Sequence, residues 1–191
     1  MRKMWYTKNI INQEVIKMKQ NQNQQLRLLT YTGLLTALTT VATMLIRIPT
    51  ITKGYINLGD TIVNIAAWML GPFYGAAAAG IGSALADLLA GYTVYVPATL
   101  VIKALMAVVC YYLYQAISRK QHSVWARIIS AIASELVMLV GYAVFEGFFY
   151  GSVSAAVLSL SGNVVQGIFG VGASVALYEL VIRHVPTKIL K

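Results

Sequence analysis

Two long stretches of this sequence are almost free of charge, and they constrain its fold more than any other feature. Residues 61–116 hold two charged side chains, and residues 128–178 hold two more. The whole chain is 58% hydrophobic and 11% charged, whereas soluble domains carry about 25% charged residues. A soluble fold of 191 residues cannot hide that much apolar surface in one core. The sequence therefore predicts an integral membrane protein. The four charges are Asp87, Lys103, Glu135 and Glu146.

The basic residues gather in three segments, and their distribution predicts the sidedness of the chain. Twelve of the 15 basic residues lie in residues 1–27, in residues 118–127 or after residue 182. Lysine and arginine in short loops mark the cytoplasmic side of a membrane. Both termini are therefore expected in the cytoplasm. The net charge of +9 belongs to these flanking segments, so nucleic acid is not expected as a partner.

The number of spans follows from this sidedness. One span at 28–46 carries the chain outward, so the block 61–116 must start outside and end inside. It must hold an odd number of crossings, and at about 20 residues a crossing it holds three. The last block starts and ends inside and holds two. We therefore expect an all-α fold, a six-transmembrane-helix bundle. The predicted spans are 28–46, 61–71, 74–90, 98–116, 128–146 and 163–182.

These spans divide the chain into three parts. Residues 1–27 form a weakly amphipathic cytoplasmic N-terminal lead-in, residues 28–183 the six-helix membrane domain, and residues 184–191 a cytoplasmic tail. Gly71 and Pro72 separate the second span from the third, since proline ends a helix at the preceding residue. The apolar, Gly- and Ser-rich connection 147–161 is expected to be a structured loop or a short re-entrant piece.

Several kinds of chemistry have no support in the sequence. There is no G-x-x-x-x-G-K-[ST] motif, so the chain is not expected to hydrolyse ATP itself. His122 and His184 fall in predicted cytoplasmic segments, and Cys110 is the single cysteine. No intramembrane nucleophile has a base beside it, and no metal or other cofactor is expected. An enzyme is therefore not predicted.

Polar residues instead gather at the outer ends of the predicted spans. An ionisable group within a span is costly and usually faces a cavity or a partner. One interpretation is an ion pair between Asp87 and Lys103 together with solvated helix ends. The other is a polar pocket open to the outside, which Tyr55 and Asn57 of the first outer loop would close. The remaining outer polar residues are Asp60, Asn64, Glu146, Asn163 and Gln166.

Aromatic residues lie at the same outer level. They fit an interfacial aromatic belt, and they equally fit a pocket in which a flat heterocycle stacks between rings while a few polar groups orient it. Glu135 lies deeper, where bundle packing or a buried hydrogen bond is expected. The aromatic residues are Tyr92, Tyr95, Tyr142, Phe145, Phe148, Phe149 and Tyr150.

Four motifs in a fixed order add a resemblance to a known family. They are INLGD at 56–60, LGPFYGA at 70–76, GIGSALADLL at 80–89 and PATLVIK at 97–103. The chain resembles the substrate-binding S components of energy-coupling factor (ECF) vitamin transporters, nearest to the riboflavin, pyridoxine and hydroxymethylpyrimidine branch. The similarity covers about residues 28–115, and the span count extends it to the whole chain.

The resemblance implies a subunit of a multi-pass cell-membrane transporter. It would bind a B-vitamin or precursor from outside, then dock on a transmembrane coupling subunit and two cytoplasmic ATPases, which use the ATP. The family's small-residue docking motif on the first span is replaced here by Gly33 and Ala37, followed by Val41. The acid- and amide-rich outer set favours pyridoxine or a hydroxymethylpyrimidine-like cargo. The predicted substrate-binding residues are Tyr55, Asn57, Asp87, Lys103, Tyr142, Glu146, Asn163 and Gln166.

One alternative function uses the same residues. A stand-alone secondary transporter or channel, coupled to protons through Asp87, Glu135 and Glu146, would need no other subunit. Inverted repeats and broken helices are typical of such proteins, and the sequence shows no convincing internal repeat.

Overall fold

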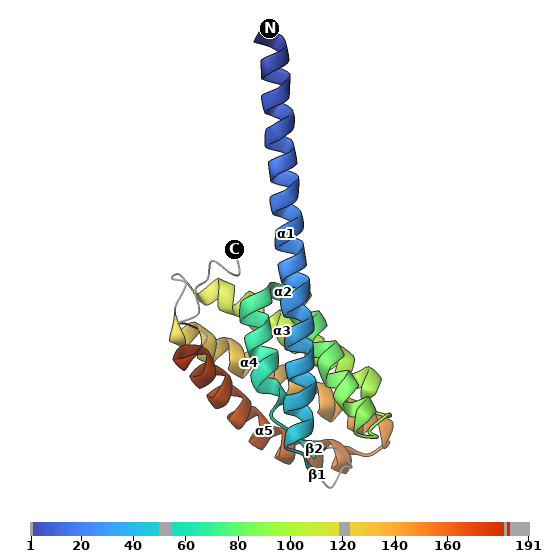
Figure 1. Ribbon diagram of the computed structural model, residues 1–191. Helices are drawn as coiled ribbons and strands as arrows, with labels where there is room; N and C mark the ends of the chain where they lie inside the picture. The colour runs from blue at the N-terminus through green and yellow to red at the C-terminus, as the bar shows by residue number, and fades with distance from the viewer. Residues whose placement is uncertain (1, 50–54, 119–122, 182, 184–191) are drawn as a thin grey trace.

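The computed structural model describes residues 2–49, 55–118, 123–181 and 183, and it is built almost entirely from helices (Figure 1). A two-residue antiparallel strand pair joins the first two helices, with Ile48 opposite Ile56 and Pro49 opposite Tyr55. The predicted all-α class is confirmed. The elements are α1 Arg2–Leu45, β1 Ile48–Pro49, β2 Tyr55–Ile56, α2 Gly59–Leu89, α3 Val96–Ile117, α4 Val124–Phe149 and α5 Val153–Leu180.

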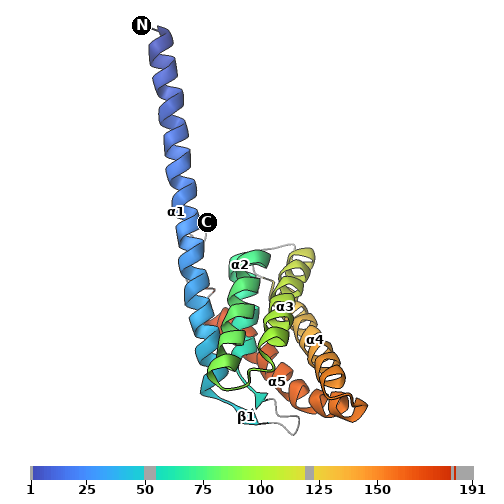
Figure 2. The same cartoon turned by 90° about the vertical axis from the view of Figure 1, so that its right-hand side faces the viewer.

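Helix α2 reverses direction at Gly71. This residue has φ 82° and ψ −174°, a backbone conformation that glycine adopts at little cost, and Pro72 follows without an amide proton to continue the helix. A straight helix of 31 residues would be about 46 Å long, yet Asp87 near its end hydrogen-bonds to Tyr55 just before its start. The two arms of α2 therefore run back along each other, as Figure 2 shows.

Several predicted boundaries differ from the structure. Six separate helices are not confirmed, because residues 61–71 and 74–90 both belong to α2 and five helices are assigned over the described residues. The prediction of a loop at 147–161 is wrong, since α5 already begins at Val153. Gly151, with φ 60°, makes the turn, and the apolar residues that follow continue as helix. The tail 184–191 and both histidines lie outside the described residues.

The outer surface of the bundle is apolar, as a membrane requires. Within the described residues, five helices are long and apolar enough to cross a bilayer, and large hydrophobic side chains such as Val140, Phe148 and Ile168 are exposed. Water would not favour such a surface, whereas lipid does. The apolar exterior and the long apolar helices are those of a multi-pass membrane protein.

Small residues let the helices approach closely. A Cβ atom on Gly82 would lie 2.7 Å from the backbone oxygen of Thr36 on α1. A Cβ atom on Gly80 would lie 2.7 Å from the backbone oxygen of Leu100 on α3. The second arm of α2 therefore packs backbone to backbone between α1 and α3, which matches the small-residue packing typical of membrane helices.

The end of the bundle opposite β1 and β2 is closed by a buried arginine. The sequence assigned Arg127 to a cytoplasmic loop, but it lies in the first turn of α4 and is fully buried. Its guanidinium carbon is 4.0 Å from the Tyr178 ring centroid and 5.6 Å from that of Tyr114. It also forms an ion pair with Glu179. Aromatic side chains of neighbouring helices therefore accommodate inside the bundle a charge that the positive-inside rule places in a loop.

Candidate functional site

The first outer loop is fixed over the bundle by Asn57. Its backbone N–H donates to Oε1 of Gln166 at 2.8 Å, and its side-chain amide donates to the same oxygen at 3.2 Å. Its own Oδ1 accepts from the backbone N–H of Gly59 at 2.8 Å. The loop is thereby joined to α5, against which β2 packs. The side-chain amide of Gln166 thus accepts the hydrogen bond that the loop backbone would otherwise make to water, and this joins two segments that are distant in sequence.

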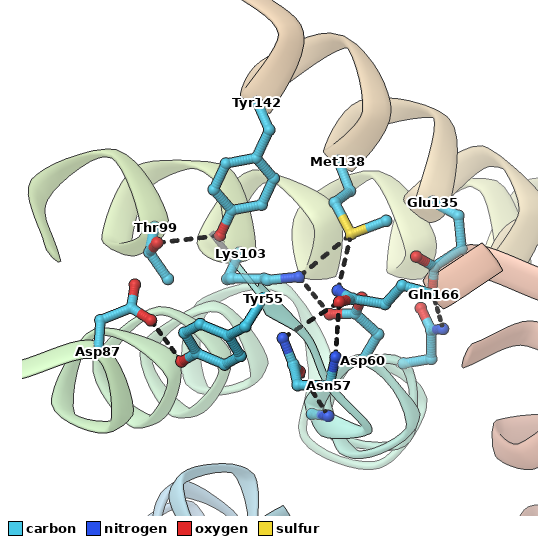
Figure 3. A network of polar contacts seen from close by, with 12 residues as sticks. Tyr55, Asn57, Asp60, Asp87, Thr99, Lys103, Glu135, Met138, Tyr142 and Gln166 are labelled. Atoms are coloured by element: carbon cyan, nitrogen blue, oxygen red, sulfur yellow. Dashed lines mark hydrogen bonds and ion pairs between the residues drawn. The ribbon is translucent and has the colours of Figure 1, made fainter. Parts of the chain in front are cut away.

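Asp60 is the centre of the polar network in Figure 3. It forms an ion pair with Lys103, and both side chains are almost completely buried, at 0% and 3% exposure. Its second oxygen accepts from Nε2 of Gln166 at 2.5 Å. The sulfur of Met138 lies 3.4 Å from Nζ of Lys103 and 3.1 Å from Nε2 of Gln166. Charges and amides from α2, α3 and α5 thus satisfy one another inside the bundle.

Asp87 lies on the other side of the network and has a different partner from the one considered in the sequence. The ion pair between Asp87 and Lys103 does not form, because Asp60 takes the lysine. Asp87 instead accepts a hydrogen bond from the Tyr55 hydroxyl at 2.5 Å. Burial, and then the carboxylate of Asp87, raise the pKa of Tyr55, so this hydroxyl stays protonated as a donor. Oδ2 of Asp87 is buried without a hydrogen-bond partner in the part of the chain described.

Aromatic side chains form one wall of the site. The Tyr142 ring centroid lies 5.5 Å from Nζ of Lys103, and its hydroxyl is 2.9 Å from the Thr99 hydroxyl. Tyr95 donates to Glu146 Oε1 at 3.3 Å and packs edge-on against Phe145 at 5.4 Å between centroids. Some of the predicted outer aromatics are therefore internal, while Phe148 is 90% exposed, as an interfacial belt residue would be.

Glu135 lies beneath this network. Its Oε1 accepts from Nδ2 of Asn64 at 3.1 Å, and both side chains are buried. The buried hydrogen bond expected for Glu135 is confirmed. Gly170 of α5 lies so close that a Cβ there would be 2.7 Å from Oε1 of Glu135. Glycine on α5 thus allows an acidic side chain to fit between the helices.

The structure brings seven of the eight predicted binding residues into this region: Tyr55, Asn57, Asp87, Lys103, Tyr142, Glu146 and Gln166. Asn163 lies half-buried on α5, three residues before Gln166. The sequence did not assign roles to Thr99 and Met138, because a threonine or methionine in an apolar span looks like packing. Thr99 lies one helical turn before Lys103 on α3. That spacing is the signal that would have identified it as a site residue.

The arrangement is suited to binding a small molecule. Carboxylates, amides and hydroxyls orient a ligand by hydrogen bonds, and the rings offer flat surfaces for stacking. Among the residues that the structure describes, no group of three or more histidine, cysteine, aspartate or glutamate side chains is placed to hold a metal ion. Several buried oxygens in the described bundle, including Oδ2 of Asp87 and Oε2 of Glu135, have no hydrogen-bond donor among the described residues.

A second feature is a surface groove on α1. It contains Gly33, Ala37 and Val41, all exposed. The threonines beside them donate their hydroxyls to backbone carbonyls of their own helix, for example Thr36 to the Thr32 carbonyl at 2.8 Å, so these hydroxyls are already satisfied. The groove is therefore apolar despite its threonines.

Comparisons with known proteins agree with this architecture. The model of the ECF-type riboflavin transporter S component family matches residues 23–183. A protein of Pyrococcus woesei, described as an uncharacterized protein in gap 3'region, is 34% identical over 134 residues, covering 69% of this chain and 86% of that protein. A solved S component of a bacterial ECF transporter superposes with a TM-score of 0.65 at 19% identity, over 85% of this chain and 99% of that one. The chain belongs to the ECF-type riboflavin transporter S component family.

Proposed function

We propose that this chain captures a flat heterocyclic B-vitamin or vitamin precursor at the outer face of the cell membrane and delivers it inward with a coupling subunit and two ATPases. The observation that carries the proposal is the buried network under the first outer loop, beside an aromatic wall, in which Asp60 joins Lys103 to Gln166 and Asp87 accepts from Tyr55. Such a set of oriented polar groups and rings recognises a small planar molecule.

Six membrane crossings follow from counting the two arms of α2 separately. Each arm is short, and burial among neighbouring helices accommodates that length. With six crossings both termini lie in the cytoplasm, and β1 and β2 lie outside. The reversal at Gly71 and the contact between Tyr55 and Asp87 support this count.

The charge of the site narrows the class of cargo. Lys103 is occupied by Asp60, so no embedded base remains among the predicted binding residues for an anionic vitamin such as folate or pantothenate. Asp87 and Glu146 instead accept hydrogen bonds. A neutral or weakly basic heterocycle is favoured, with pyridoxine or a hydroxymethylpyrimidine as our first choice. Riboflavin, after which the matching family is named, is the second.

Titration calorimetry of the purified chain tests the cargo. Pyridoxine or hydroxymethylpyrimidine is expected to bind, and folate and pantothenate are expected to give no heat, because their carboxylates would enter a site already rich in acid. Binding of riboflavin alone would replace the first choice by the second. Tight binding of folate or pantothenate would contradict the charge argument altogether.

Glu146→Ala and Asn163→Ala are each expected to weaken binding by roughly 10- to 100-fold, the cost of one or two lost hydrogen bonds at about 1–3 kcal/mol. Val140→Ala on the exposed side of α4 is the matched control and should bind normally. Calorimetry measures affinity, and thermal unfolding in detergent shows whether the bundle is intact. Unchanged affinity in both variants would move the site elsewhere.

The groove on α1 is the proposed docking face for the coupling subunit. Gly33, Ala37 and Val41 leave room for a close helix, so Ala37→Phe is expected to lower uptake roughly tenfold while ligand affinity stays unchanged. Leu38→Phe, on a neighbouring exposed face, is the control and should transport normally. Equal uptake by both variants would show that docking uses another surface.

A stand-alone proton-coupled transporter remains the second candidate, because buried carboxylates at Asp87 and Glu135 are the kind of groups that carry protons in such proteins. It predicts uptake without ATPases. The first candidate predicts that energy comes from other subunits, in line with the missing phosphate-loop motif.

A further inference from the structure

The outer network holds more buried acid than buried base. The buried carboxylates in and beside it are Asp60, Asp87, Glu135 and Glu146, each no more than 4% exposed. Among the described residues Lys103 is the one buried base near them, and Asp60 already neutralises it. Arg127, the other buried base of the described bundle, pairs with Glu179 at the opposite end. The network therefore carries an excess of negative charge, which is costly inside a membrane protein until a cation offsets it.

Asp87 is the carboxylate best placed to meet a ligand that comes from outside. It lies in the last turn of α2 and accepts at Oδ1 from the hydroxyl of Tyr55 in the outer strand β2, at the edge of the network away from Asp60 in Figure 3. Its Oδ2 is buried and has no donor in the described part of the chain. Glu135 lies deeper, with Asn64 on one oxygen and the backbone of Gly170 close against it. Asp87 therefore offers an acceptor oxygen at the outer end of the bundle.

The position of Asp87 along α2 is unfavourable for an acid. The carbonyl groups at the C-terminal end of a helix give it a partial negative charge, which attracts cations and repels carboxylates. The last turn of α2 has no basic residue, and Asp87 adds a buried carboxylate to it. A positive group beside Asp87 would thus be stabilised by the carboxylate and by the helix end together.

The rings around Asp87 also suit a cation. The ring of Tyr55, the hydrogen-bond donor to Asp87, lies 4.6 Å from that of Tyr92 between centroids. Ring contacts continue from Tyr92 to Tyr95 at 6.4 Å and from Tyr95 to Tyr142 at 6.5 Å. The Tyr142 ring already lies near the ammonium group of Lys103. The faces of phenol rings attract cations, most strongly where water is excluded, so this wall favours a positively charged ring over a neutral one.

We propose that the cargo binds as a cation, with a protonated amine or ring nitrogen that donates its N–H to Oδ2 of Asp87 while its ring lies against the tyrosines. This proposal rests on the proposed function and deepens it, because it narrows the neutral or weakly basic heterocycles to those that are positively charged in the site. A neutral alcohol forms an ordinary hydrogen bond to a carboxylate, whereas a charged N–H forms the stronger, charge-assisted one.

The test compares ligands that differ in one charged group. Pyridoxamine and aminomethylpyrimidine each replace one hydroxyl of pyridoxine and hydroxymethylpyrimidine by an amine, which is protonated at neutral pH. Titration calorimetry of the purified full chain measures all four affinities. Each amine is expected to bind roughly 30-fold more tightly than its alcohol, the gain of one charge-assisted hydrogen bond over a neutral one. This comparison uses the unmodified chain, so it does not depend on the folding of a variant.

Two variants with the same change of charge locate the effect. Asp87→Asn keeps the shape of the side chain and an oxygen for the Tyr55 hydroxyl, and it should reduce the preference for the amines to within about twofold. Affinity for the alcohols should change by less than about threefold. Glu135→Gln removes a charge from the deeper buried carboxylate and should keep a preference above about tenfold. Thermal unfolding in detergent shows whether each bundle is intact.

Three results would overturn the proposal and leave the proposed function intact. The first is equal affinity of the unmodified chain for amine and alcohol. The second is a preference for the amines that persists in Asp87→Asn. The third is an equal loss of preference in Glu135→Gln, which would assign the effect to the total charge of the network and not to Asp87. Absence of heat with all four ligands would instead count against the proposed cargo itself, and this proposal would fall with it.

Discussion

Lys103→Met is expected to lower the free energy of unfolding by about 3–5 kcal/mol, the usual cost of breaking a buried ion pair by removing one partner. The variant leaves the carboxylate of Asp60 fully buried beside Gln166 and without its cation. Methionine keeps most of the length of lysine, so the loss reports charge and not volume. Thermal unfolding of the purified chain in detergent measures the effect, and ligand binding should be lost with it because the network orients the site.

A double-mutant cycle separates the pair from its surroundings. Asp60→Asn alone leaves Lys103 unpaired and should cost a similar amount, while the double variant Asp60→Asn with Lys103→Met removes both charges. Its stability should recover to within about 1–2 kcal/mol of the unmodified chain, since replacing a buried pair by neutral groups is often nearly neutral. Additive losses in the double variant would show that the two side chains do not depend on each other.

Arg127→Ala is expected to be the other large destabilisation, again about 3–5 kcal/mol. It removes a fully buried side chain that packs against Tyr178 and Tyr114 and forms an ion pair with Glu179. Because this cluster lies far from the outer network, ligand affinity measured well below the unfolding temperature should be nearly unchanged. Stability and binding are therefore affected separately at the two ends of the bundle.

Arg183→Ala is the matched control for this prediction. Arg183 pairs with the same glutamate at 3.1 Å, one helical turn away, but its side chain is 48% exposed. Exposed pairs of this kind contribute about 0.3–0.5 kcal/mol. A loss as large as that of Arg127→Ala would mean that burial of the guanidinium and its aromatic contacts are not what stabilises the inner end.

Much of the architecture is predictable from loop charge and from a few helix-breaking residues. The break at Gly71 and Pro72 is predictable to the residue, because proline ends a helix at the preceding residue. The start of α5 is not predictable in this way, since residues 153–161 are apolar and Ser-rich and fit a loop as well as a helix. Only the packed structure shows that they form the first turns of α5.

The sequence predicts the depth of the site residues in the membrane, but it does not predict which side chains pair with each other. Sequence placed Asp60, Asp87 and Lys103 at one depth in the membrane, yet depth does not specify rotation about each helix axis. The rotation of α3 directs Lys103 to Asp60 and leaves Asp87 to Tyr55. Arg127 was misassigned for a related reason. The rule that basic residues mark cytoplasmic loops treats a charge near a helix end as part of the loop, whereas Tyr178 and Tyr114, distant in sequence, enclose it.

Uptake of the bound vitamin, with and without the coupling subunit and ATPases, tests the central claim most directly. The chain is expressed alone or with those subunits in cells that lack their own uptake system, and labelled ligand identified by calorimetry is followed over time. The account predicts transport that falls to background without the other subunits, while binding at the cell surface persists. Undiminished uptake by the chain alone, driven by a proton gradient, would contradict it.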